Sequence, residues 1–397
     1  MKLIPIHSFC VLVTVLVTVL VISATSTTGN GAKFSGGALN DKTTERYTES
    51  WSSLDSRPLP GWYDDAKFGI FVHWGVYSVP GMSSEWFWNH WKEKWPDALE
   101  YMRKNYPPGF QYADFGTQFK AEFFNATKWA ELVARSGAKY FVFTSKHHDG
   151  FVNWNTSYAW NWNSVALGPH RDIVGELATA FHNQNSVAFG LYFSLYEWYN
   201  PLYLKDKASN FTKKQFIETT VMPQLKELIE TYKPQYLWSD GDWEATAEYW
   251  DSRKFLQWLY NDSPVASSVV TNDRWGKGCR CLHGDVHNCA DRYNPGKLQS
   301  HKWENAMTIM KNSWGIVRDG YIEDFHSVKE LIKELVSTVS CGGNLLMNIS
   351  PASDGTIPVI YQERLQQIGD WLRVNGEAIY GSKPWKAQND TSESSVW

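Results

Sequence analysis

The chain has little net charge for its length, and this shortage excludes whole classes of partner. Its 38 basic and 42 acidic side chains leave a formal charge of -4 over 397 residues, with no long run of like charge. Nucleic acids and anionic membrane surfaces are bound by clustered positive charge, so we expect neither as a partner. A neutral ligand fits this composition better.

Long apolar runs are equally scarce. The one such run, residues 9–22, follows Lys2 and precedes small polar residues, which is the order of a signal peptide. It is shorter than the roughly 20 apolar residues that cross a bilayer, and no later segment is apolar enough to do so. We therefore predict a signal peptide over 1–28, a polar lead-in over 29–49, and a secreted or lysosomal protein that does not contact the membrane after cleavage.

Cysteine is also rare. Removing the signal peptide takes Cys10 with it, and an even number of cysteines then stays in an exported chain: Cys279, Cys281, Cys289 and Cys341. This predicts one or two disulfides. Three of these thiols lie near His283 and His287, a grouping that is also able to hold zinc, although the exported context favours disulfides. Glycan acceptor motifs begin at Asn125, Asn155, Asn210 and Asn389.

Short apolar runs alternate with polar loops and amphipathic stretches, which is typical of βα units on a parallel sheet. Strands are predicted at 68–73, 140–144, 187–194, 236–239, 268–272 and 345–349. This makes six or seven strands where a closed barrel needs eight. We therefore predict an α/β fold with an irregular (β/α)8-like TIM barrel over 50–385, followed by a polar tail over 386–397. A doubly wound open sheet is the alternative.

Chemically active side chains follow these apolar runs. His73 ends the first run, His147 and His148 follow the second, and Asp240 and Arg274 follow two later ones. In a TIM-like barrel the carboxyl ends of the strands form the active face, so we expect these residues to converge.

Local alternatives exist for each of these residues. Asp240 precedes a glycine and fits an ordinary turn or helix cap, and Asp242 and Glu244 compete with it for any catalytic role. His73, His147 and His148 are able to bind sugar hydroxyls, or a metal in a metal-dependent hydrolase. Glycoside hydrolysis needs a second carboxyl group, for which Asp285, Asp291 and Glu304 are the downstream candidates.

Several longer motifs resemble, in the same order, those of the α-L-fucosidases of glycoside hydrolase family 29. They are the stretches at 61–75, 84–87, 145–151, 238–241, 272–276 and 301–304, with the similarity running from about Arg46 to Trp385. The resemblance implies a (β/α)8-like barrel and a retaining hydrolase of terminal α-L-fucose on glycoproteins, glycolipids or oligosaccharides. It implies no metal and no other cofactor, with fucosylated glycans as partners and a homo-oligomer left open.

The resemblance also implies site residues. Asp240 matches the nucleophile, and the positions that grip the fucose are His73, Glu85, Trp86, His147, His148, Tyr192 and Arg274. Asp291 and Glu304 are alternatives for the acid/base. We favour Asp291, because a Glu that follows Trp in an apolar context suits a structural partner of a buried Arg or His. The position beyond Arg274 that some bacterial relatives use holds no Glu.

Two departures from the family pattern stand out. Ala306 occupies a position where the family usually carries Cys, and we expect the C-terminal β-sandwich domain of relatives to be missing or truncated. An inactive fucose-binding homologue is therefore a further alternative.

Overall fold

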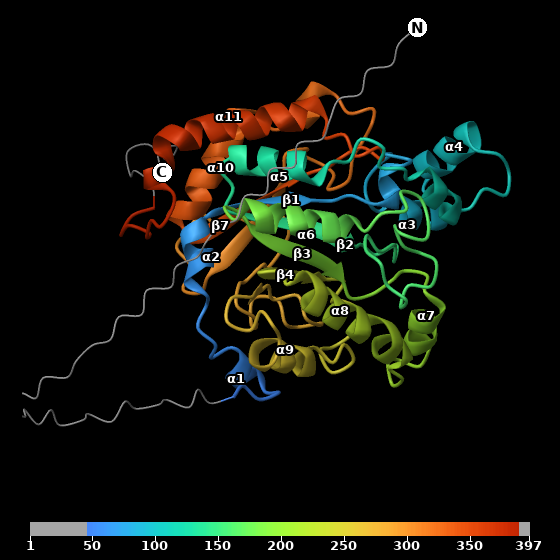
Figure 1. Ribbon diagram of the computed structural model, residues 1–397, viewed down its shortest axis with the longest axis horizontal. Helices are drawn as coiled ribbons and strands as arrows, with labels where there is room; N and C mark the ends of the chain where they lie inside the picture. The colour runs from blue at the N-terminus through green and yellow to red at the C-terminus, as the bar shows by residue number, and fades with distance from the viewer. Residues whose placement is uncertain (1–45, 389–397) are drawn as a thin grey trace, which may run out of the picture. The chain divides into compact units, whose positions relative to one another are not determined.

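The computed structural model describes residues 46–388, which form an α/β fold around a parallel sheet (Figure 1). Its strands run in the order β5-β4-β3-β2-β1-β7-β6. They are β1 (Phe68–Val72), β2 (Tyr140–Lys146), β3 (Ala188–Ser194), β4 (Tyr236–Asp240), β5 (Val270–Thr271), β6 (Trp303–Thr308) and β7 (Gly343–Ile349). Strands that follow one another in the chain are neighbours, except that β5 and β6 form the two edges, and β7 returns to pair with β1. This is the order of a barrel, so the barrel-like prediction is confirmed and the doubly wound alternative is wrong.

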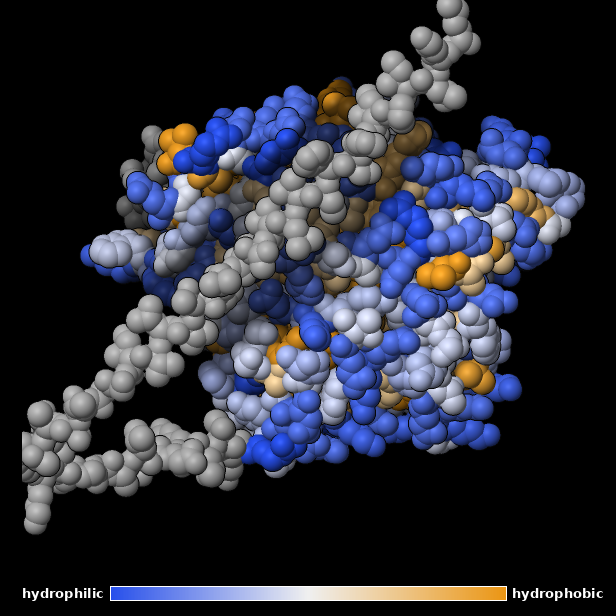
Figure 2. All heavy atoms as spheres, viewed as in Figure 1, coloured by the Kyte–Doolittle hydropathy of each residue, from blue (hydrophilic) through white to orange (hydrophobic). Residues whose placement is uncertain are grey.

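Helices cover the outside of the sheet. The α-helices are α1 (Trp51–Leu54), α2 (Gly61–Ala66), α3 (Phe87–Lys92), α4 (Pro96–Asn105), α5 (Ala126–Arg135), α6 (Ile173–Gln184), α7 (Pro201–Ala208), α8 (Met222–Tyr232), α9 (Ser252–Asn261), α10 (Val328–Ser340) and α11 (Val359–Asn375). Shorter helical turns are η1 (Val76–Ser78), η2 (Tyr112–Gln118), η3 (Ile217–Val221), η4 (Ile322–Asp324) and η5 (Gly376–Ala378). Five of the helices pack side by side in the order α8, α6, α5, α11, α10. The molecular face in Figure 2 is mostly hydrophilic, as expected for helices that bury one stripe and expose the other.

Local sequence explains where several helices begin. Asn125 accepts a hydrogen bond from the backbone N–H of Lys128 at the start of α5, and Ser327 and Glu330 form a capping box at the start of α10. A π-helical turn, η3, is followed directly by α8, which has Pro223 in its first turn.

Alternation along the strands separates two clusters of buried side chains. In β1, Ile70 and Val72 pack in the large cluster that includes the helices, whereas Phe71 joins a smaller one on the other side of the sheet. This inner cluster is rich in aromatic rings: Tyr63, Phe71, Tyr140, Tyr192, Tyr236 and Trp238. Gly69 is required here, because a Cβ atom would lie 2.5 Å from the ring of Tyr140.

A short extended segment lies between the two edge strands. The backbone N–H of Val286 donates to the carbonyl of Thr271 in β5, and Glu304 in β6 donates its N–H to the carbonyl of His287. His287 also forms a parallel bridge with Trp303. Residues 285–287 thus take the place of an eighth strand, and they are too few to be recognised as one from the sequence; β6 is the other strand absent from the six that we predict.

Some predictions fall on residues that the structure does not describe. The signal peptide over 1–28, most of the lead-in over 29–49 and most of the tail over 386–397 lie outside residues 46–388. Among the described helices, none combines the length and the apolar character that a membrane span requires.

Candidate active site

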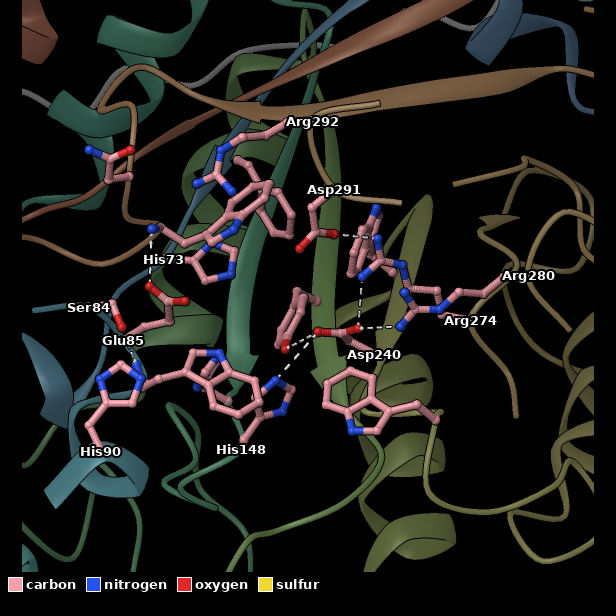
Figure 3. A pocket seen from close by; sticks show the side chains of 18 residues that line it. His73, Ser84, Glu85, His90, His148, Asp240, Arg274, Arg280, Asp291 and Arg292 are labelled. Atoms are coloured by element: carbon pink, nitrogen blue, oxygen red, sulfur yellow. Dashed lines mark hydrogen bonds and ion pairs between the residues drawn. The ribbon is translucent and has the colours of Figure 1, made fainter. Parts of the chain in front are cut away.

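A pocket of about 340 Å³ opens where the carboxyl ends of β1 to β4 meet. Nine of the ten residues predicted from the sequence line it: His73, Glu85, Trp86, His147, His148, Tyr192, Asp240, Arg274 and Asp291 (Figure 3). The tenth, Glu304, does not. The convergence expected from strand-end positions is therefore observed, since these residues are separated by up to 218 positions in the chain, from His73 to Asp291.

Asp240, the last residue of β4, is surrounded by polar and positively charged side chains. Its carboxylate accepts hydrogen bonds from the Tyr192 hydroxyl at 2.9 Å and from Arg274 Nη1 at 3.0 Å. Arg280 Nη2 lies 3.7 Å away and His148 Nε2 lies 3.6 Å away (Figure 3). The next residue, Gly241, has φ of +73°, and a Cβ atom there would lie 2.3 Å from the Tyr196 ring.

The environment keeps Asp240 ionised. Burial favours the protonated carboxyl, but the positive charges of Arg274 and Arg280, together with the hydrogen bonds from Arg274 and Tyr192, outweigh it and lower the pKa of Asp240 below its usual value. A buried carboxylate that is charged at neutral and mildly acidic pH is suited to nucleophilic attack.

Arg274 joins two carboxylates. While Nη1 contacts Asp240, Nη2 contacts both Asp291 and the side-chain oxygen of Asn288. The guanidinium lies over the ring of Trp238, with 4.6 Å between its carbon and the ring centroid. The two carboxylates differ in exposure, because the side chain of Asp240 is 12% exposed and that of Asp291 is 45% exposed.

Two of the three pocket histidines predicted from the sequence have a defined tautomer. His73 Nδ1 lies 2.7 Å from the amide oxygen of Asn348, and His148 Nδ1 lies 2.7 Å from the hydroxyl of Ser194, whose own proton goes to the carbonyl of Tyr196. Each Nδ1 therefore carries the proton and leaves Nε2 as an acceptor. Burial lowers the pKa of His73 to about 4 and the pKa of His148 well below its usual value, so both rings are neutral.

His147 differs from the other two, because its buried Nδ1 has no hydrogen-bond partner within residues 46–388. Burial and the neighbouring histidines lower its pKa as well. Among the described residues, the nitrogens of His73, His147 and His148 do not gather within 4.8 Å of one another as metal ligands would. The arrangement therefore suits hydrogen bonding to hydroxyl groups better than metal binding.

Glu85 and Trp86 also line the pocket. One carboxylate oxygen of Glu85 accepts the backbone N–H groups of Trp314 and Gly315, at 3.0 and 2.9 Å, and burial raises the pKa of this carboxyl. The Trp86 ring contacts that of His148 and stacks with that of Trp243 at 6.2 Å. Such flat rings bind the apolar face of a sugar.

Glu304 lies in the inner cluster and outside the pocket lining. Its side chain is fully enclosed by four donors: the hydroxyls of Tyr63, Tyr140 and Tyr236, and the Trp238 indole N–H, at 2.6 to 3.1 Å. The structural partners are thus hydroxyl groups and an indole instead of the Arg or His that we expected. Ala306, which stands where the family usually carries Cys, belongs to the same cluster and does not line the pocket.

The other candidate carboxylates have structural partners. Asp242 is ion-paired with Arg280 at 2.6 Å, and Asp285 with the buried Arg57 at 3.0 Å. Glu244 contacts Lys207 at 2.7 Å. None of the three lines the pocket.

A disulfide closes the short loop between Arg280 and Asp291. Cys281 and Cys289 are bonded, while Cys279 and Cys341 are free and buried. The prediction of one or two disulfides is met by one among the described residues. Two of the three thiols of the alternative zinc site are therefore used by the disulfide, and the ring of His287 stacks on that of His301.

Sequence reasoning missed several residues of this pocket. Arg280 comes just before the disulfide and Arg292 directly follows Asp291, and both line the pocket. Trp243 and Trp314 add two further aromatic rings. All four lie in loops, where no periodic pattern indicates which way a side chain points.

Comparisons with known proteins agree with this geometry. A family model described as Alpha-L-fucosidase matches residues 38–377. An α-L-fucosidase of Branchiostoma floridae is 58% identical over 354 residues, covering 89% of this chain and 79% of that protein. The plasma and tissue α-L-fucosidases of Homo sapiens are 57% and 55% identical, each covering 89% of this chain and 76% of their own length. A solved structure of Thermotoga maritima α-fucosidase in complex with fucose is 37% identical, with a TM-score of 0.75 over 86% of this chain and 80% of that one.

Proposed function

The chain belongs to the α-L-fucosidase family and is an α-L-fucosidase, a glycoside hydrolase; we propose that it acts with retention, through a covalent fucosyl-enzyme intermediate on Asp240. The main support for this proposal is that the guanidinium of Arg274 contacts two carboxylates, Asp240 and Asp291, which differ in their exposure to solvent. Retaining glycosidases use two carboxyl groups about 5–5.5 Å apart, and a shared guanidinium holds such a pair at short range.

In the first step, an oxygen of Asp240 attacks the anomeric carbon while the bond to the leaving oxygen breaks. Asp291 donates a proton to that oxygen. In the second step Asp291 takes a proton from water, the water oxygen attacks the anomeric carbon, and Asp240 is released. The inversions of the two steps cancel, which leaves the fucose configuration unchanged.

The proposed roles of Asp240, Asp291 and Glu304 agree with the surroundings of each side chain. Asp240 is shielded, charged and held by donors, as a nucleophile needs to be. Asp291 is exposed enough to exchange protons with solvent and to meet the leaving group. Glu304 is enclosed by donors on every side, so we assign it a positioning role. It anchors Trp238, the ring on which Arg274 lies.

We further propose that the neutral histidines, Glu85 and Trp86 select the sugar. The free Nε2 atoms of His73 and His148 accept hydroxyl protons, and the Trp86 ring covers an apolar face. The fucose complex of the bacterial relative supports fucosylated glycans as substrates. The names of the plasma and tissue relatives and the signal-like N-terminus support secretion or lysosomal delivery, with a catalytic region over 50–385 after a signal peptide over 1–28.

The test compares wild type, Asp240→Gly and Asp291→Ala on an aryl α-L-fucoside, with and without azide. We expect Asp240→Gly to lose about 10³-fold or more in kcat, because the covalent route is closed. Asp291→Ala should lose most on substrates with poor leaving groups, and azide should restore part of its turnover. Near-normal turnover by Asp240→Gly would refute the assignment of the nucleophile.

A further inference from the structure

A second cavity, here called the aromatic pocket, lies beside the catalytic one. It measures about 210 Å³ and is lined by Trp88, Tyr112, Asp149, Tyr158, Trp160, Trp162, Glu197 and Tyr199, among others. These residues come from the segments that follow β1, β2 and β3, so the aromatic pocket belongs to the same end of the barrel as the catalytic pocket. Trp198, whose ring contacts Trp86 and His148, directly precedes Tyr199.

The walls of the aromatic pocket are held in place by contacts between rings. Trp88 stacks on Tyr112 with centroids 4.5 Å apart and 4° between the planes, and it meets Tyr199 edge-on at 4.5 Å. Tyr112 also contacts Trp162 at 6.2 Å. A preformed set of flat apolar surfaces binds a ligand at little cost in side-chain entropy.

The rim of the aromatic pocket exposes further rings to solvent. Trp160 is 66% exposed and Tyr158 is 42% exposed. Large apolar side chains gathered at the mouth of a cavity are typical of a binding surface. A ligand entering the cavity would remove both rings from water.

The floor supplies hydrogen-bond acceptors. Asp149 and Glu197 are 5% and 8% exposed and both line the cavity. Asp149 accepts the Tyr112 hydroxyl at 2.8 Å, and Glu197 accepts Lys146 Nζ at 3.0 Å. Because each carboxylate oxygen has two lone pairs, both groups keep capacity for a hydroxyl or amide donor of a ligand.

The charge of the floor favours a neutral ligand. Lys146 compensates Glu197, whereas Asp149 forms no ion pair with any residue that the structure describes. Burial raises the pKa of Asp149 to about 7, so at mildly acidic pH this group is protonated and uncharged. An ammonium ligand would find no net charge to compensate it, whereas a sugar needs none.

We infer that the aromatic pocket is a second sugar-binding site, which holds one pyranose ring of a glycan while the catalytic pocket holds the fucose. The inference rests on the proposed glycan substrate. The volume of the aromatic pocket is below the roughly 300–1,000 Å³ of clefts that bind drug-sized ligands, so the pocket accommodates about one pyranose ring.

The ring has two possible sources with the same chemistry. One is the glycan substrate itself. The other is a glycan attached to this chain at Asn155, which is exposed and lies three residues before Tyr158 at the rim. Both would present a pyranose ring to Trp160 and Tyr158.

The experiment compares Trp160→Ala with the matched control Trp385→Ala, whose ring is 71% exposed and lies outside both pockets. Each is assayed on an aryl α-L-fucoside and on a fucosylated biantennary N-glycan. Loss of one stacking ring should raise the KM for the glycan about fivefold, with the aryl fucoside kinetics unchanged. The control should alter neither substrate. Tyr158→Ala serves as a second variant and should act in the same direction.

Repeating the pair in an Asn155→Gln background separates the two sources. If the substrate supplies the ring, Trp160→Ala raises the KM for the glycan in both backgrounds. If the attached glycan fills the pocket, the effect of Trp160→Ala appears only after Asn155→Gln. No effect of Trp160→Ala or Tyr158→Ala in either background overturns the inference. A wild type inactive on the aryl fucoside would instead contradict the proposed function.

Discussion

Replacing Glu304 with glutamine distinguishes the two assignments of the second carboxyl. Oε1 of Glu304 accepts the Trp238 N–H at 2.9 Å and the Tyr236 hydroxyl at 3.1 Å, and Oε2 accepts two tyrosine hydroxyls. The glutamine oxygen can replace Oε1. Its NH₂ group can replace Oε2, because the hydroxyls of Tyr63 and Tyr140 can rotate and accept. Trp238 then keeps the hydrogen bond that its indole N–H donates to residue 304.

The expected cost is small. Charge-assisted hydrogen bonds become neutral ones, which should lower the free energy of unfolding by about 1–3 kcal/mol. Catalysis should fall by less than about tenfold, whereas loss of a general acid costs about 10²–10⁴-fold. Glu304→Ala is the wrong probe, because it leaves four buried donors unpaired at about 1–3 kcal/mol each. That loss approaches the entire stability of many proteins, about 5–15 kcal/mol.

The assay measures kcat/KM for aryl fucosides with good and poor leaving groups, with and without azide, alongside thermal unfolding. Glu304→Gln should slow all substrates equally and show no azide rescue, whereas Asp291→Asn should be slowed most on poor leaving groups. The reasoning is refuted if Glu304→Gln folds normally, loses about 10²-fold or more and depends on the leaving group, while Asp291→Asn does not.

Three further predictions follow from the pocket. Arg280→Gln removes a positive charge that lowers the pKa of Asp240. Because Asp240 must be ionised to attack, the acidic limb of the pH profile of kcat/KM should move to higher pH. The surface control Arg253→Gln should leave that limb in place. Replacing Cys281 and Cys289 with serine should lower the free energy of unfolding by about 2.5 kcal/mol, read from denaturant unfolding. It should also lower kcat/KM by about tenfold, because Arg280 and Asp291 lie directly on either side of the disulfide loop; unchanged stability and activity would contradict this. Treatment with a chelator should leave aryl fucoside turnover unchanged, and a loss restored by a divalent cation would favour the metal-dependent alternative.

Much of the fold could be predicted, because most strands are apolar runs followed by a polar residue. Two exceptions have physical reasons. β6 carries Glu304 on its inner face and Asn305 toward α10, where Asn305 contacts Glu334, so neither apolar alternation nor a continuous apolar run marks it as a strand. Residues 285–287 bridge β5 and β6 over too few positions to give a pattern.

The site was predictable where strand ends determine position. His73 and His148 follow strands and Asp240 ends one, and the barrel brings them together. The choice between Asp291 and Glu304 depends on which side of the inner cluster each carboxyl faces, and sequence spacing carries no such information. Arg280 is positioned by a disulfide whose pairing cannot be deduced from the number of cysteines.

Direct trapping of the intermediate tests the central claim. A 2-fluorinated fucosyl fluoride, which forms the intermediate faster than water releases it, should add one fluorofucosyl group to the protein. Peptide mass spectrometry should find that group on Asp240. A label on Asp291 or Glu304, or a first product of inverted configuration with no label at all, would contradict Asp240 as the nucleophile of a retaining mechanism.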